Sequence, residues 1–297
     1  MSVGGAGAVY DRGYRPYDGP RGLRGAATYA LYKASIRRAL GIRRSWRQKF
    51  APFLLLGIVT VPAIVNVGIG YVTRDRVVDA VEIITYREYV GVSSALLLFV
   101  ALVAPDVMCP DRRQRVLPLM FARPLTGIDY VVSKVGAIAS ILFAFSFLPQ
   151  VVLFVGNMLV SDSAAHYFSG HMDVLWKVPV SVGLLAIYYA VIGVAIASLT
   201  DRRIVAGAAV IGLFLITSIS SSIIVGDIVN GQGSIGGLIN VLGLPLFLRD
   251  LVFLGHVNPD SPLAGVDHGG PFAIATYVAI LLLGAGVLLR RYRWVER

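Results

Sequence analysis

Residues 131–159 read VVSKVGAIASILFAFSFLPQVVLFVGNML, a long and almost unbroken apolar stretch. A helix of about 20 apolar residues crosses the ~30 Å hydrocarbon core of a bilayer and satisfies its own backbone hydrogen bonds there. This stretch is therefore long enough to form a transmembrane helix. Five more stretches share its character, at residues 50–71, 89–106, 176–199, 204–225 and 272–289. The sequence predicts an all-α integral membrane protein with six transmembrane helices.

The overall composition supports the same class. Of the 297 residues, 56% are hydrophobic and 15% are charged, and the mean hydropathy is +0.73. A water-soluble globular protein could not keep so much apolar surface away from water. Away from their ends the six stretches contain no Asp, Glu, Lys, Arg or His, which disfavours ion-coupled transport. The single cysteine, Cys109, excludes an internal disulfide.

The distribution of positive charge predicts the topology. The net charge is +10. Most Lys and Arg residues fall in segments that a cytoplasmic N-terminus places in the cytoplasm, and only Arg74, Arg76, Arg87, Lys177 and Arg249 fall on the other side. By the positive-inside rule both termini are cytoplasmic, and the first stretch, which follows a long basic segment, is expected to remain as a helix rather than be cleaved. The surplus charge suits anionic lipids and partner proteins and does not indicate nucleic acid.

Composition and hydropathy divide the sequence into three regions. Residues 1–25 are rich in Gly, Arg, Tyr and Pro and predict a disordered cytoplasmic tail. Residues 26–49 predict an interfacial amphipathic helix that ends near Gly41, with an apolar stripe of Tyr29, Tyr32, Ile36 and Leu40 beside basic residues. A basic flank that only fixes the topology remains an alternative. Residues 50–297 form the predicted six-span domain.

The segment at residues 109–130 combines basic and apolar residues. We expect Asp111 to cap a short amphipathic helix over residues 110–121, and Pro124 to end it. Such a helix needs a membrane surface or a protein groove to cover its apolar side, and the groove is favoured.

The predicted external segment 226–271 is long and rich in glycine. Its part at residues 235–254 is apolar but is interrupted by Gly243, Pro245, Arg249 and Asp250. These interruptions predict a re-entrant external hairpin before the last span, with an additional pair of spans as the alternative.

Recognisable catalytic motifs are missing from the sequence. The dipeptide Gly-Lys does not occur, so the chain has no P-loop and cannot itself hydrolyse ATP by that mechanism. The sequence contains no HExxH, no G-x-S-x-G and no paired cysteines. His166, His171, His256 and His268 fall in predicted external loops, where solvated turns are a better interpretation than a metal site. We expect no metal and no catalytic residue.

A few polar residues lie inside the predicted spans. They are candidates for a transport pathway or a dimer seam: Asn66, Gln150, Asn157, Thr217, Ser218 and Ser221. Structural roles are favoured for them, because Ser and Thr can bond to their own helix and small residues let helices approach.

The residues around the loop resemble a known family. Asp111-Arg112-Arg113, the leucine-rich run 117–121, Arg123-Pro124-Leu125-Thr126, Asp129-Tyr130 and Lys134 together resemble the ABC-2 type permease family. Members carry an acidic-basic cluster, a leucine-rich coupling helix, a Pro-containing segment and a Tyr-x-x-x-Lys entry to the third span. This chain departs from that pattern at Asp111, where Glu is commoner, at Arg115 and at Gly127.

The resemblance implies a function. Members of the family are membrane subunits of ATP-driven exporters, so the chain would move an amphiphilic drug, lipid or peptide out of a prokaryotic cell across its plasma membrane. It would pair with a second permease subunit, as a homodimer or heterodimer, and with two copies of an ABC ATPase that binds ATP and Mg²⁺. No cofactor is implied in this chain. The implied coupling-helix contacts with the ATPase are Asp111, Arg112, Arg113, Gln114, Leu117, Met120, Phe121 and Arg123.

Two other functions remain open. One is an ATP-independent channel or carrier. The other is a membrane-bound enzyme with an external site around His256 and Asp260.

Overall fold

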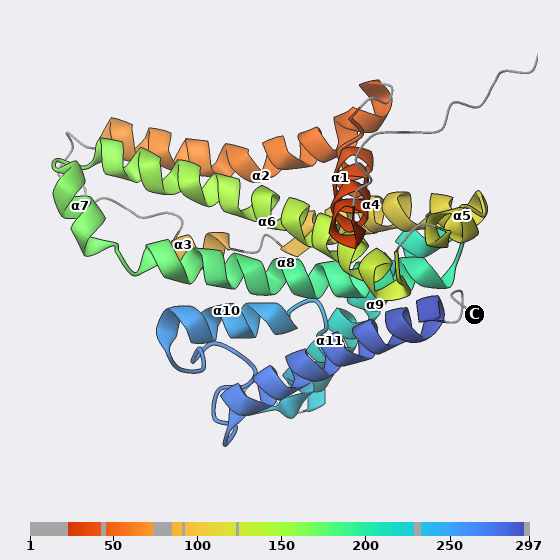
Figure 1. The fold of residues 1–297 in the computed structure, drawn as a ribbon. Helices are drawn as coiled ribbons and strands as arrows, with labels where there is room; N and C mark the ends of the chain where they lie inside the picture. The colour runs from red at the N-terminus through yellow and green to blue at the C-terminus, as the bar shows by residue number, and fades with distance from the viewer. Residues whose placement is uncertain are drawn as a thin grey trace, which may run out of the picture.

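The computed structural model describes residues 23–42, 46–73, 85–90, 93–122, 125–228 and 233–293. Within these residues every regular element is helical, as Figure 1 shows, so the predicted all-α class is confirmed. The long helices are α2 (Trp46–Thr73), α4 (Ser93–Arg113), α6 (Gly127–Val160), α8 (Val174–Leu199), α9 (Arg203–Ile223) and α11 (Gly269–Arg293). The shorter elements are α1 (Arg24–Ala39), α3 (Tyr86–Tyr89), α5 (Leu117–Phe121), α7 (Ala164–Gly170), the π-helix η1 (Ile224–Ile228), the 3-10 helix η2 (Ile235–Ile239) and α10 (Leu244–Leu254).

Five helices are long and apolar enough to cross a membrane. They are Pro52–Val72 within α2, the whole of α6 and α8, Arg203–Gly226 starting with α9, and α11. The chain is therefore a multi-pass membrane protein. The remaining predicted span, residues 89–106, falls on α3 and α4. Helix α4 is not among the five, and a sixth span stays a prediction.

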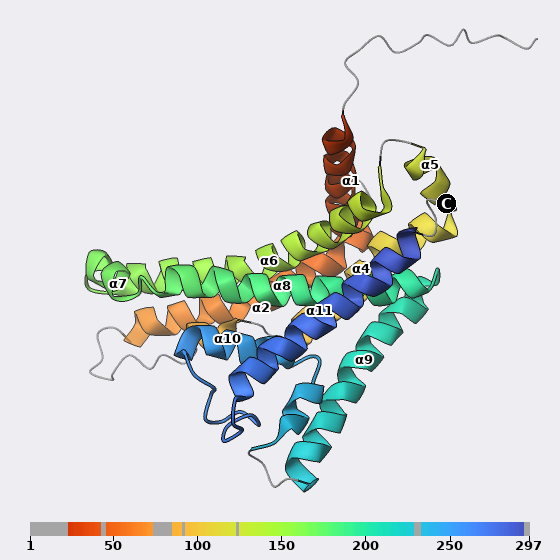
Figure 2. The same ribbon diagram turned by 60° about the horizontal axis from the view of Figure 1, so that its bottom comes forward.

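Helix α8 lies at the centre of the bundle. It packs against α4, α6, α9, α10 and α11, and α6 in turn packs against α1 and α2 (Figures 1 and 2). In the apolar segment of α8, 72% of the residues are buried, whereas only 6% are buried in that of α2. A helix that is apolar all round must be covered by protein or by lipid. Protein covers α8, and we infer that lipid or another subunit covers the exposed face of α2.

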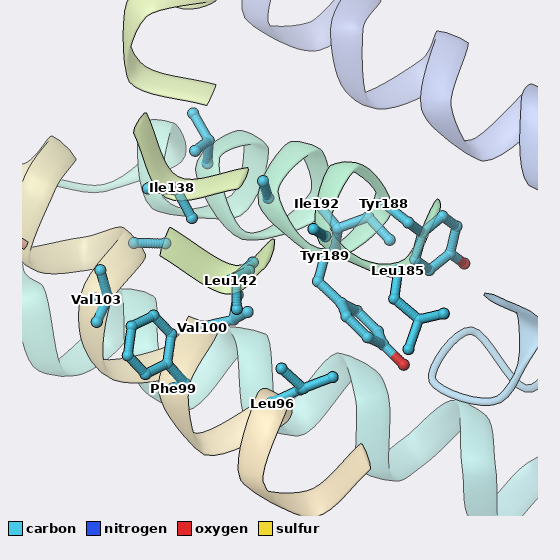
Figure 3. Close-up of a cluster of buried hydrophobic side chains, with 14 of the residues drawn as sticks. Leu96, Phe99, Val100, Val103, Ile138, Leu142, Leu185, Tyr188, Tyr189 and Ile192 are labelled. Carbon is cyan, nitrogen blue, oxygen red and sulfur yellow. The ribbon is translucent and has the colours of Figure 1, made fainter. Parts of the chain in front are cut away.

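The core is formed where α4, α6 and α8 meet. Figure 3 shows side chains from the three helices in this region: Leu96, Phe99, Val100 and Val103 from α4, Ile138 and Leu142 from α6, and Leu185, Tyr188, Tyr189 and Ile192 from α8. These residues are all buried. Contacts among them pack α4 against α6 and α8.

Glycines let α4 approach its neighbours closely. A Cβ added at Gly193 on α8 would lie 2.4 Å from Val100 Cγ1 on α4. A Cβ added at Gly207 on α9 would lie 2.9 Å from the carbonyl oxygen of Ala101. Small residues at crossing points are typical of helices that pack within a bilayer, where close van der Waals contact replaces the hydrophobic effect.

The last four residues of the predicted interfacial segment, 26–49, belong to α2. Its first part is helix α1. It begins at Arg24, and the chain leaves it through Gly41, whose φ of 64° is the left-handed conformation that favours glycine. The helix packs against α6 and α4, so protein covers part of it. Its location at a membrane surface stays a prediction. Residues 1–22 of the predicted tail and residues 43–45 lie outside the described residues.

The predicted external hairpin is helical in three short pieces, η1, η2 and α10. Gly243 is the N-cap of α10, Pro245 stands in its first turn, and Gly255 follows its end with a φ of 76°. Gly243 and Pro245 therefore mark the start of α10 rather than a break within it, and Arg249 and Asp250 lie inside the helix. Helix α10 packs on α8 and α11. Its depth in the bilayer, and with it the re-entrant path, stays a prediction.

We expect Gly193→Leu to loosen the contact between α8 and α4. The added side chain collides with Val100, and overpacking of this kind costs about 1–3 kcal/mol. The apparent melting temperature of the detergent-purified protein, followed by intrinsic fluorescence, should fall by several degrees. The matched control is Gly183→Leu on the same helix, because a Cβ there meets nothing within 4 Å. Equal melting temperatures for the two variants would contradict this packing.

Candidate functional site at the charged end of the bundle

A buried carboxylate stands where three helices meet. Asp111, in the last turn of α4, is only 1% exposed. Its Oδ1 lies 2.5 Å from Nη1 of Arg38 on α1, and its Oδ2 lies 2.6 Å from Nζ of Lys134 on α6. The hydroxyl of Tyr130 donates a hydrogen bond of 3.0 Å to the same Oδ2. One carboxylate therefore joins α1, α4 and α6.

The ionised state of Asp111 is stabilised by the cations of Lys134 and Arg38. Burial by itself would raise the pKa of the Asp111 carboxyl, but the ammonium of Lys134 and the guanidinium of Arg38 outweigh burial and lower it. Asp111 is thus ionised at neutral pH. Lys134, at 2% exposed, also donates to the carbonyl oxygen of Val107 at 3.1 Å. Buried charges are tolerated in this way only when they are paired and hydrogen-bonded.

Aromatic rings extend the cluster to α5 and α11. The ring of Tyr130 lies 4.8 Å from that of Tyr292 on α11 and 6.1 Å, edge to face, from that of Phe121 on α5. Tyr130 and Tyr292 are both buried. Close packing of Gly127 against the backbone of Tyr292 brings α6 and α11 together at the same point. The ends of five helices, α1, α4, α5, α6 and α11, therefore meet around Asp111 (Figure 2).

A second joint fixes the end of α4 to the turn between α8 and α9. Arg112 Nη1 donates to the carbonyl oxygen of Ser198 at 2.6 Å. Arg203 Nη1 pairs with Asp106 Oδ1 at 3.0 Å. Contacts on both sides therefore attach the end of α4 to α1 and α6 and to α8 and α9.

A third set of polar contacts joins α1 to the start of α6. Arg24 Nε lies 2.8 Å from Asp129 Oδ2, and Asp129 with Thr126 forms the capping box that begins α6. The Ser133 hydroxyl donates to the carbonyl oxygen of Thr28. These contacts set the orientation of α1 relative to α6.

The residues predicted to contact an ATPase fall into three groups. Arg113 and Gln114 are exposed; Arg112, Met120 and Phe121 are half-buried; Asp111 and Leu117 are buried. Arg123 lies outside the described residues. The exposed face of α5 also contains Leu119, which is 71% exposed and large. Sequence reasoning placed Leu119 in the apolar run but not among the contacts.

The predicted helix over residues 110–121 is corrected in two respects. Asp111 caps no helix: it lies within α4, and the N-cap of α5 is Val116, which makes no side-chain cap. The helix is also not continuous, because residues 114–116 separate α4 from α5 and Arg115 adopts a φ of 51°. Asp111 is instead buried in the last turn of α4, where Lys134 and Arg38 pair with its carboxylate.

The polar residues of the predicted spans lie in two separate places. On α9, Ser218 Oγ donates to Asn240 Oδ1 at 2.8 Å and Ser221 Oγ donates to the carbonyl oxygen of Gly236 at 3.0 Å, while Thr217 bonds back to Leu213. These bonds attach α9 to the segment around η2.

The other polar residues lie on α6 and α2. Gln150 and Asn157 both donate to Tyr86 on α3, at 3.3 Å and 3.4 Å. Asn66 is half-buried on α2. The described structure does not bring the α9 group and the α6 group together into one pathway.

The described residues contain no group of three or more His, Cys, Asp and Glu side chains that could hold a metal ion. His256 is exposed, and its Nδ1 lies 2.9 Å from the carbonyl oxygen of Val257. Asp260 is exposed as well.

No protein-family model matches this sequence, and no curated protein matches it. The fold defines the class of the protein, a helical multi-pass membrane protein whose described helices meet in a charged cluster at one end.

We expect Asp111→Asn to destabilise the protein by roughly 3–5 kcal/mol, because it leaves Lys134 charged, buried and without its carboxylate. The double variant Asp111→Asn with Lys134→Met should recover much of this loss, because the buried ammonium is then removed and the Arg38 guanidinium that remains is partly exposed to solvent. Thermal unfolding of the detergent-purified variants measures both. Arg113→Ala, an exposed change on the same helix, is the control. If Asp111→Asn behaved like Arg113→Ala, the buried pair would not exist in solution.

Proposed function

We propose that this chain is the membrane-spanning permease subunit of an ATP-driven ABC exporter, which moves an amphiphilic substrate outward with a separate ATPase subunit. One observation carries the proposal. Helix α5 is anchored on one side by buried Leu117 and by Phe121 against Tyr130, while its other side presents Leu119 to solvent beside exposed Arg113 and Gln114. Leu119, together with the partly exposed Met120 next to it, gives α5 a short apolar side that suits a groove on a partner protein.

The anchoring gives α5 the properties of a lever. A partner that moved α5 would act through Phe121 and Tyr130 on α6, and through the short connection at residues 114–116 on α4. Both helices are joined by Asp111 and Lys134, so their ends would move together. Rigid-body movement of packed helices is a common way to transmit such a signal.

The proposal includes a topology and an assembly. Helix α4 is the second of six spans, α10 belongs to a re-entrant external hairpin, and both termini lie in the cytoplasm of a prokaryotic cell. Two permease subunits, identical or different, pair in the plasma membrane above two ATPase subunits. ATP and Mg²⁺ bind to the ATPase subunits, and the permease chain holds no cofactor.

We expect an ATPase to copurify with the chain and to be lost when the exposed surface of α5 is changed. The test variant carries Arg113→Ala, Gln114→Ala and Leu119→Ala, three exposed positions whose change leaves the Asp111 cluster intact. The tagged chain is expressed with its genomic neighbours, solubilised gently and analysed by mass spectrometry. Recovery of the ATPase should fall at least tenfold, with the melting temperature of the permease unchanged.

A matched surface change controls for nonspecific effects. Asp201→Ala, Arg202→Ala and Ile204→Ala alter the neighbouring turn, where these three residues are also exposed. This variant should keep its ATPase. If no ATPase accompanies the folded wild-type chain, the exporter proposal fails and an ATP-independent channel or carrier becomes the better explanation.

The topology has its own test in single-cysteine variants. Cys109 is the single cysteine of the sequence, so the variant Cys109→Ser provides a background free of thiols. We expect a membrane-impermeant maleimide to label cysteines introduced at His166 and Asp260 in intact cells, and to label one introduced at Gln114 only after the membrane is opened. All three positions are exposed in the fold. Labelling of the Gln114 position in intact cells would reverse the proposed orientation.

A further inference from the structure

Two arginines from different helices come together at the charged end of the bundle. Arg112 belongs to the last turn of α4 and Arg291 to the last turn of α11. Tyr292, next to Arg291 in the chain, packs its ring 4.8 Å from that of Tyr130. Tyr130 donates to Asp111, the neighbour of Arg112. The ends of α4 and α11 therefore lie beside each other, as Figure 2 shows.

The two guanidiniums carry the same charge and are only partly in contact with water. Both residues are half-buried. Arg112 lies close enough to Arg291 to repel it, and both act on the buried Tyr292 between their helices. Repulsion between like charges grows as water is excluded from around them. An anion in contact with both groups would therefore be bound favourably.

The carboxylates at this end of the bundle do not neutralise the two arginines. Asp111 and Asp106 each pair with other cations. Asp201 is exposed in the turn between α8 and α9. Within the described part of the chain, no ion pair joins a carboxylate to Arg112 or to Arg291. The anion has to come from outside these residues.

An apolar stripe on α11 leads to the arginine pair. Leu283, Val287 and Arg291 follow one another at intervals of four residues, so they lie along one face of the helix. Leu283 is 69% exposed and Val287 is 42% exposed. Helix α11 is long and apolar enough to cross a membrane, so an exposed apolar face of this kind meets lipid chains. The stripe places an apolar surface directly before a positive charge, which matches the chains and the phosphate of a phospholipid.

The chemistry of the pair favours a lipid phosphate with net negative charge. Guanidiniums bind phosphate oxygens through paired N–H donors, and basic pockets between membrane-spanning helices hold anionic headgroups in this way. Arg290 and Arg293 are exposed in the same turn of α11 and would repel the ammonium of a choline headgroup. An acidic surface of a partner protein offers the same charge but no chains to cover Leu283 and Val287.

From this geometry we propose that Arg112 and Arg291 bind the phosphate of one anionic glycerophospholipid, with an acyl chain along Leu283 and Val287. The lipid belongs to the leaflet at the charged end of the bundle. Its phosphate neutralises the pair and joins the end of α4 to the end of α11. The site needs no ATPase, so its failure would leave the exporter proposal standing.

Lipid titration followed by native mass spectrometry tests the site on the delipidated full chain in detergent. The probes are phosphatidylglycerol, which has a net negative charge, and phosphatidylcholine, which has none. We expect the wild type to bind one phosphatidylglycerol at least tenfold more tightly than phosphatidylcholine. Arg291→Gln should weaken phosphatidylglycerol binding at least fivefold. Arg290→Gln removes the same charge from the exposed neighbouring position and should change binding less than twofold.

Two further arms separate the parts of the site. Arg112→Gln removes the α4 half of the pair and should also weaken phosphatidylglycerol binding at least fivefold. Glycerol 3-phosphate carries the phosphate without chains, so a hundredfold excess of it should not displace the lipid.

Four results would overturn the proposal. One is equal affinity of the wild type for the two lipids. Another is an equal effect of Arg291→Gln and Arg290→Gln, which would indicate only general attraction to a positive surface. Displacement by glycerol 3-phosphate would identify a site for free phosphate. Loss of a copurifying ATPase in Arg291→Gln, with lipid binding unchanged, would assign the pair to a protein interface. If Arg291→Gln failed to fold, the wild-type comparison of the two lipids and Arg112→Gln would still decide.

Discussion

The ionised carboxylate of Asp111 has to be paired, because it is buried where water cannot solvate it. Its two cations come from α1 and α6, so the requirement for pairing becomes a requirement that three helix ends meet. Tyr130 adds a hydrogen bond and brings the rings of Phe121 and Tyr292 to the same place. The tyrosine that bonds the carboxylate is therefore also the one that α5 and α11 contact at this end of the bundle.

The rest of the bundle is held by a different force. Along α4, α6 and α8 the contacts are apolar and close, and glycines such as Gly193 and Gly207 let backbones approach at the crossings. In a bilayer apolar side chains gain little by leaving lipid for protein, so fit at such crossings decides which faces pair. Helix α8 has partners on all sides, whereas α2 keeps most of its apolar surface on the outside.

The two ends of the bundle differ in whether their buried polar groups have partners. Near Asp111 each fully buried charge named above has a partner. Near Gln150 a buried acceptor has no hydrogen-bond partner among the described residues.

The sequence by itself determined the class of the protein and many local boundaries. Long apolar stretches require helices in a bilayer, Gly41 ends α1, and Gly243 with Pro245 starts α10, because these effects depend on composition and on backbone geometry within a few residues. Only the tertiary structure decided that Asp111 is a buried joint and not a helix cap, and that Leu119 rather than Leu117 is exposed on α5. Lys134, within an apolar stretch, was a signal that a carboxylate would be needed. Its partner could not be read from the pattern, because the burial of a side chain depends on which distant helices cover it.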